Sequence, residues 1–137
     1  MTITVRRDPA GPMRQRVRIR AHELIADEQP DNGGEDAGPD PHDLYDAALG
    51  ACKALTMLWY AKRKGIALDD VAVDVERDRS QEAAGTYRLR TVLSLGGALS
   101  DADRDRLLAV AGKCPLHKLM TQVTTEIETV LADINPG

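Results

Sequence analysis

Two cysteines are the residues of this chain whose side chains could carry redox chemistry. Cys52 lies in the middle of a long apolar segment with helical periodicity, and Cys114 opens the segment CPLHKLM. Because Pro115 follows it, Cys114 occupies the position of a helix N-cap, where the positive end of the helix dipole favours a thiolate. Cys52 has no such position, so its thiolate needs a neighbouring arginine, lysine or protonated histidine. Two interpretations stay open: a reactive pair, or two inert buried residues.

The first cysteine belongs to the best-defined helix of the chain, which we predict over residues 41–65. Asp40 is placed to cap its start, with Pro41 at the first helical position and Asp43 favoured by the dipole in the first turn. Three basic residues followed by Gly65 indicate its end. Residues spaced three and four apart share one face, which we expect to be buried in the core: Leu44, Ala48, Cys52, Leu55 and Trp59.

Alternating apolar and polar residues predict the strands of the chain. They lie near residues 2–7, 13–20 and 23–27 before the helix, at 71–75 and 87–95 after it, and at 123–131 near the end. Ser100 begins a capping box for a second helix that ends near Gly112, and a short third helix follows Cys114. Short connections require antiparallel pairing of the first three strands. We therefore expect an α+β fold with antiparallel sheet, in a single domain of residues 1–137.

The composition limits the classes of partner. The formal net charge is −4, and the basic residues are not massed into one patch. Alternate arginines at 14–20 predict a solvated basic face of one strand rather than a binding surface. Aromatic residues make up only 3% of the chain, with no Phe, so no stacking platform for nucleic acid is expected. The same shortage leaves a thin core, which burial against a second copy of the chain would extend.

No segment of the sequence approaches the length of a transmembrane span, and the N-terminus MTITVRRDPAG lacks the apolar centre of a signal peptide. We therefore expect no membrane association and a cytoplasmic protein. The cytoplasm keeps thiols reduced, so two cysteines do not indicate a structural disulfide framework there.

Two motifs together resemble the OsmC/Ohr family, the osmotically inducible and organic hydroperoxide resistance proteins. The first is the run GPDPHDLYDAALGACKALTMLWYAKRKGI, and the second is GKCPLHKLM followed by an alternating segment. The resemblance covers nearly the whole chain. It implies an OsmC-like fold, an intertwined homodimer in which sheets from both chains wrap two long central helices.

The resemblance also implies a cysteine-based peroxidase that acts on hydroperoxides in oxidative stress defence. Cys52 would be the peroxidatic cysteine and Cys114 the resolving one. The Cys52 thiolate would attack the peroxide and become a sulfenic acid, and Cys114 would condense with it to a disulfide. An external dithiol would reduce the pair again, and no cofactor or metal is needed.

The sequence departs from the family pattern where the thiolate should be activated. Catalytic members carry a Glu near the start of the first helix, which orients an Arg from the N-terminal strands. His42 stands at the matching position here. Arg7 is the best match for the Arg, and Arg14 and Arg16 compete with it. A protonated His42 could itself favour the Cys52 thiolate.

Two alternatives come from other classes of function. Cys52, Cys114 and His117 could bind a metal ion, whereas His42 lies too far along the helix to join them. The other alternative is a non-enzymatic dimer that binds a small apolar ligand at the interface between its helices, with inactive cysteines.

Overall fold

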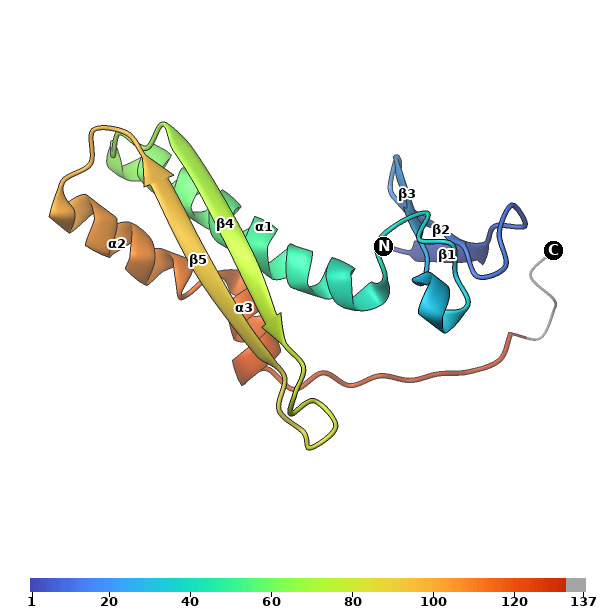
Figure 1. Cartoon of the computed structure of the whole chain (residues 1–137). Coiled ribbons are helices and arrows are strands. Elements are labelled where there is room, and N and C mark those ends of the chain that lie inside the picture. The colour runs from blue at the N-terminus through green and yellow to red at the C-terminus, as the bar shows by residue number, and fades with distance from the viewer. Residues whose placement is uncertain (133–137) are drawn as a thin grey trace.

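The computed structural model, which describes residues 1–132, contains two antiparallel sheets and three α-helices (Figure 1). The N-terminal sheet has the order β1 (Ile3–Arg7), β2 (Gln15–Ile19) and β3 (His22–Ala26), and a single 3-10 turn, η1 (Pro30–Asn32), follows it. The second sheet is a hairpin of β4 (Asp70–Asp78) and β5 (Arg88–Gly96). The α+β class and the antiparallel pairing predicted from the sequence are confirmed.

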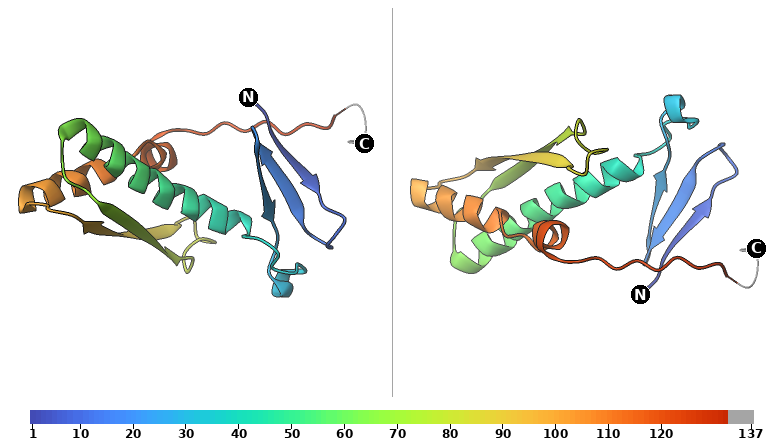
Figure 2. Two further views of the ribbon diagram at one scale, coloured as in Figure 1. Left: turned by 90° about the horizontal axis from the view of Figure 1, so that it is seen from above. Right: turned by 90° about the horizontal axis from the view of Figure 1, so that it is seen from below.

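The N-terminal sheet stands apart from the rest of the chain. In Figures 1 and 2 it lies beyond the N-terminal end of α1 (Pro41–Lys64), whereas the hairpin and the other helices pack along α1 itself. Val17 at the centre of β2 stands opposite Val5 on one side and Leu24 on the other. All three are at least partly exposed, so the apolar side of this sheet has little cover within one chain.

The ends of α1 form as the sequence predicts. The Asp40 side chain accepts a hydrogen bond from the Asp43 N–H at 2.8 Å, and the Asp43 side chain accepts one from the Asp40 N–H at 3.1 Å. Gly65 ends the helix with φ at 68°, a left-handed conformation that favours glycine. Because these signals are local, the helix boundaries are among the best-predicted features of the chain.

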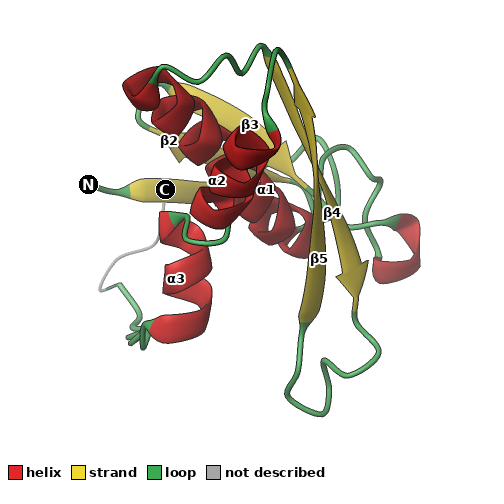
Figure 3. Cartoon of the chain, turned by 90° about the vertical axis from the view of Figure 1, so that its left-hand side faces the viewer, coloured by secondary structure: helices red, strands yellow, loops and turns green. Residues whose placement is uncertain are grey.

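Helix α1 is packed on two sides. It contacts β4, α2 (Asp101–Ala111) and α3 (Pro115–Gln122), and Figure 3 shows the hairpin beside the helices. At Gly50 the helix approaches the sheet so closely that a Cβ atom would lie 2.9 Å from Cγ2 of Val75. The buried centre of this core consists of Met57, Ala61, Leu107 and Ala111.

The face of α1 that we expected in the core is not the face that its own chain covers. Leu55 is 65% exposed and Trp59 is 59% exposed, while Cys52 is only partly buried. The buried positions are instead Asp46, Leu49, Gly50, Lys53, Met57 and Ala61. Helical periodicity identified an apolar stripe, but α1 carries apolar residues on more than one side and includes a lysine on its buried side.

The prediction of a strand at residues 123–131 is wrong for the isolated chain. After α3 the described chain runs on without a strand to residue 132, and Ile127 and Leu131 are 83% and 96% exposed. Figure 2 shows this segment leaving the helices and extending towards the N-terminal sheet. A strand needs a hydrogen-bonded neighbour, and no neighbouring strand pairs with this segment among residues 1–132.

Among the helices that the structure describes, none combines the length and the apolar character needed to cross a membrane.

Two neighbouring leucines of α2 test the position of the core. Leu107 is fully buried and Leu108 is 61% exposed. We expect Leu107→Ala to lower the free energy of unfolding by about 2–5 kcal/mol, because it removes buried methyl groups and leaves a cavity. Leu108→Ala, the matched control, should cost less than about 1 kcal/mol. Urea unfolding measures both, and equal losses would contradict this core.

Candidate functional site

The two cysteines meet at the N-terminal end of α3. Cys114 is the N-cap residue of this helix, and its Sγ accepts a hydrogen bond from the His117 N–H at 3.4 Å. The Leu116 N–H points at the other sulfur, Sγ of Cys52, at 3.5 Å. The position of Cys114 at a helix N-cap is thus confirmed, and α1 brings Cys52 to the same place. Both sulfurs are free thiols.

The two thiols differ in access to solvent. Cys114 is completely buried, whereas Cys52 is partly exposed. Burial is the main reason that the pKa of Cys114 is raised above its ordinary value, and a hydrogen bond with Cys52 raises it further. The His117 N–H and the charge of Lys53 act in the opposite direction. Cys52 is therefore the thiol that a reagent from solution can reach.

Cys52 opens into an apolar groove along α1. The groove has a volume of about 690 Å³ and is bounded by α1 and by the end of α2 with the turn into α3. Its lining is mainly aliphatic and aromatic: Ala48, Ala51, Cys52, Leu55, Thr56, Trp59, Val110, Lys113 and Pro115. The exposed stripe of α1 and the accessible sulfur thus belong to one surface.

A buried lysine that the sequence analysis did not single out lies beside the sulfurs. Lys53 is 3% exposed, and its Nζ donates a hydrogen bond to the Ala111 carbonyl oxygen at 2.8 Å. The same atom lies 2.9 Å from Nδ1 of His117. The signal for Lys53 was its position next to Cys52, but a lysine within an amphipathic helix is usually solvated.

His42 lies at the other end of this region. Its Nε2 is 3.2 Å from both carboxylate oxygens of Glu82, and its ring meets Tyr87 edge-on at 5.8 Å between centroids. Cys52 follows His42 by ten residues, which corresponds to roughly 15 Å along a helix. Within one chain His42 therefore pairs with a carboxylate and does not reach the sulfurs.

A charged network holds this end of α1 to the hairpin. Arg77 of β4 forms ion pairs with Asp43 and with the buried Asp46. The Tyr87 O–H donates to the two carboxylate oxygens of Asp46 at 2.7 and 2.9 Å. The hydrogen bond from Arg77 is the main reason that the pKa of Asp43 is lowered. The network supports the helix that carries Cys52.

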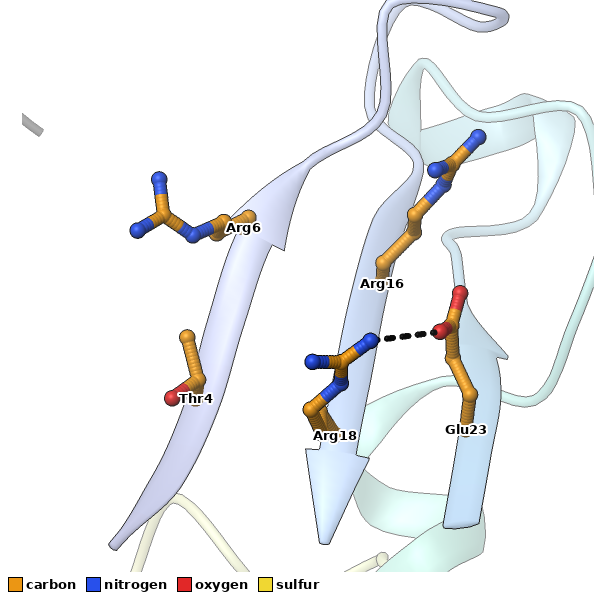
Figure 4. Close-up of a pocket in the computed structure, with 5 residues that line it drawn as sticks. All are labelled: Thr4, Arg6, Arg16, Arg18 and Glu23. Carbon is orange, nitrogen blue, oxygen red and sulfur yellow. Dashed lines mark ion pairs between the residues drawn. The ribbon is translucent and has the colours of Figure 1, made fainter. Parts of the chain in front are cut away.

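The arginines proposed as thiolate activators lie in the N-terminal region. Arg7 ends β1, Arg14 pairs with Glu35 at 3.5 Å, and Arg16 pairs with Asp8 at 3.3 Å. Figure 4 shows the basic face of this sheet, where Arg6, Arg16 and Arg18 project from β1 and β2. Within one chain this sheet lies beyond the N-terminal end of α1 (Figure 1), so the activating role of Arg7 stays a prediction.

The metal alternative finds no support in the geometry. Among residues 1–132, no group of three or more His, Cys, Asp or Glu side chains is arranged to hold a metal ion. His117, the expected third ligand, instead places Nδ1 against the Lys53 ammonium.

Comparison with known proteins identifies the family. The family model described as OsmC-like protein matches residues 33–129, which include both cysteines. The chain belongs to the OsmC-like family. Comparison with the curated proteins gives no match.

Solved structures share the fold. An OsmC-like protein from Mycoplasma pneumoniae is 20% identical, with a TM-score of 0.73 over 89% of this chain and 87% of that one. The organic hydroperoxide resistance protein OsmC from Legionella pneumophila is 19% identical, with a TM-score of 0.61 over 89% and 90%. OhrB, the organic hydroperoxide resistance protein of Bacillus subtilis, is 19% identical, with a TM-score of 0.57 over 88% and 90%. At these identities the likeness establishes the fold.

The difference between the two thiols gives a direct test. We expect Cys52, measured in the Cys114→Ser variant, to react with iodoacetamide at pH 7 at least about tenfold faster than Cys114 in the Cys52→Ser variant. Cys114 is buried and its raised pKa keeps it protonated at neutral pH, so its rate should rise only at alkaline pH. Mass spectrometry of quenched samples measures both rates. Faster alkylation of Cys114 would contradict the assignment of Cys52 as the accessible thiol.

Proposed function

We propose that this protein is a thiol-dependent peroxidase that reduces organic hydroperoxides in oxidative stress defence. The observation that carries the proposal is the meeting of two free thiols at the start of α3, one accessible from an apolar groove and one buried. Membership of the OsmC-like family supports it, as does the likeness in fold to proteins named for organic hydroperoxide resistance.

The accessible thiol takes the first step. The Cys52 thiolate attacks the terminal oxygen of the hydroperoxide, the O–O bond breaks, and the departing alkoxide takes a proton and leaves as the alcohol. Cys52 is left as a sulfenic acid. The Leu116 N–H, 3.5 Å from Sγ of Cys52, is oriented to stabilise negative charge on that sulfur.

The buried thiol takes the second step. Cys114, as a thiolate, attacks the Cys52 sulfur and displaces hydroxide, which leaves as water, and a Cys52–Cys114 disulfide forms. An external dithiol then supplies two electrons and two protons to restore both thiols. A resolving cysteine beside the sulfenic acid protects it from further oxidation. We expect this cycle in the cytoplasm, where dithiol reductants are available.

The groove supports the choice of substrate class. Its lining residues next to Cys52, among them Ala48, Leu55 and Trp59, offer apolar surface to the alkyl part of a hydroperoxide. Hydrogen peroxide has no such part and gains nothing from this surface. An organic hydroperoxide is therefore the expected substrate.

We also propose that the working form is a homodimer. The stripe that carries Leu55 and Trp59 is exposed in one chain, and a second copy is the partner that would cover its outer side, while the part of the groove beside Cys52 stays open to the substrate. A second copy also supplies strand edges to which the extended residues 123–132 could pair, and it could bring Arg7 of β1 towards Cys52. The roles of Arg7 and His42 are proposed within that dimer.

Oxidation by cumene hydroperoxide tests the peroxidase. One equivalent should consume both thiols and lower the mass of each chain by two hydrogens, as read by thiol count and intact mass. Cys52→Ser should abolish peroxide consumption. Cys114→Ser should complete one turnover and then accumulate sulfinic acid at Cys52. Unchanged thiols in excess peroxide would refute the peroxidase and favour the ligand-binding alternative.

Replacing one of two alanines by glutamate tests the dimer. Ala51 lies in the groove, and Ala72 lies exposed on β4. Light scattering should give a dimer for the unchanged protein and for Ala72→Glu, but a monomer or a much weaker dimer for Ala51→Glu, because burying a carboxylate in an apolar interface is costly. A monomeric unchanged protein at micromolar concentration would contradict the dimer.

A further inference from the structure

Lys53 is a buried cation without a buried anion. It is 3% exposed, and none of the ion pairs among the described residues includes it. Removing a charge from water is costly unless an opposite charge compensates it. The lysine lies instead beside the residues that flank Cys114, and its charge acts on the Cys114 thiol, which makes the lysine informative about the chemistry of that thiol.

The Lys53 ammonium group is held by two residues that flank Cys114 in the sequence. Ala111 precedes Cys114 by three residues and His117 follows it by three, and Nζ of Lys53 contacts both, at 2.8 and 2.9 Å. A lysine ammonium only donates hydrogen bonds, so Nδ1 of His117 accepts and the neutral ring carries its proton on Nε2. Two of the three N–H bonds are thus used, and the third has no acceptor among the described residues.

We propose that Lys53 is the fixed cation of the dithiol pair, a positioning residue that stabilises the Cys114 thiolate while Cys114 attacks the sulfur of Cys52. This inference rests on the proposed function and adds the group that makes its second step possible. In support, the charge of Lys53 lowers the pKa of Cys114 against the effect of burial.

The other charged and titratable groups at this place do not fill that role. Cys52 is the partner of the reaction, and His117 is neutral in this tautomer. Lys113 lines the groove but is exposed, so water screens its charge. A positive charge fixed inside the core acts on a neighbouring thiolate at a lower effective dielectric than an exposed one.

The role can be measured without any peroxide. An aromatic disulfide whose released thiolate is coloured reacts with Cys52 to give a mixed disulfide and one thiolate. Cys114 then attacks the Cys52 sulfur of that mixed disulfide, forms the Cys52–Cys114 bond and releases a second thiolate. The first release reports the reactivity of Cys52, and the second reports the thiolate of Cys114.

Lys53→Gln keeps a hydrogen-bond donor but removes the charge. We expect it to slow the second release about tenfold at pH 7 and to move the pH profile of that release up by about one unit, since one pKa unit is a tenfold change in thiolate. The first release should change less than about threefold. Lys53→Arg should restore the second release, and Lys118→Gln, which removes an exposed charge of α3, should leave both releases unchanged.

An unchanged second release in Lys53→Gln would overturn the proposal. Equal slowing of both releases together with a lower melting temperature would also overturn it, because that is the result of a purely structural role. If Lys53→Gln does not fold, a folded Lys53→Arg chain decides: a second release within threefold of the unchanged protein supports the role, and its loss refutes it. Failure of the peroxidase itself would appear separately, as normal aromatic disulfide exchange without oxidation by hydroperoxide.

Discussion

The packing of α1 between the β4–β5 hairpin and α2 decides where every other part of the site lies. Gly50 allows the helix to approach Val75 of the sheet, and Met57 and Ala61 bury the same side against Leu107. With this side fixed inward, the helical period turns Cys52 towards the start of α3 and leaves Leu55 facing outward. Small changes in that packing would rotate the sulfur away from its partner.

The two thiols obtain their different characters from the elements that hold them. Cys114 begins a helix and is enclosed by the turn between α2 and α3, so it combines a favourable dipole with complete burial. Cys52 sits within a helix and gains the same dipole only from the side, through the Leu116 N–H. One helix terminus thus serves two sulfurs, and the difference in burial separates the accessible thiol from the protected one.

Local signals in the sequence were enough to predict the helices and most strands. The caps at Asp40 and Ser100 are contacts between residues three apart, and both form as the pattern indicates. The buried face predicted for α1 and the strand predicted at 123–131 are not found within one chain, because each depends on what covers it, which periodicity cannot reveal. Lys53 was missed for a similar reason: its contacts with Ala111 and His117 link residues far apart in the sequence.

Cys114 caps α3 with the same sulfur that the proposed reaction uses. A thiolate accepts the hydrogen bond from the His117 N–H strongly. A neutral thiol accepts it weakly, and so does the uncharged sulfur of a disulfide. If the helix terminus stabilises the thiolate, the thiolate stabilises the helix by the same free energy. The first turn of α3 is therefore a reporter of the chemical state of its own cap, and its hydrogen exchange would register each step of oxidation and reduction.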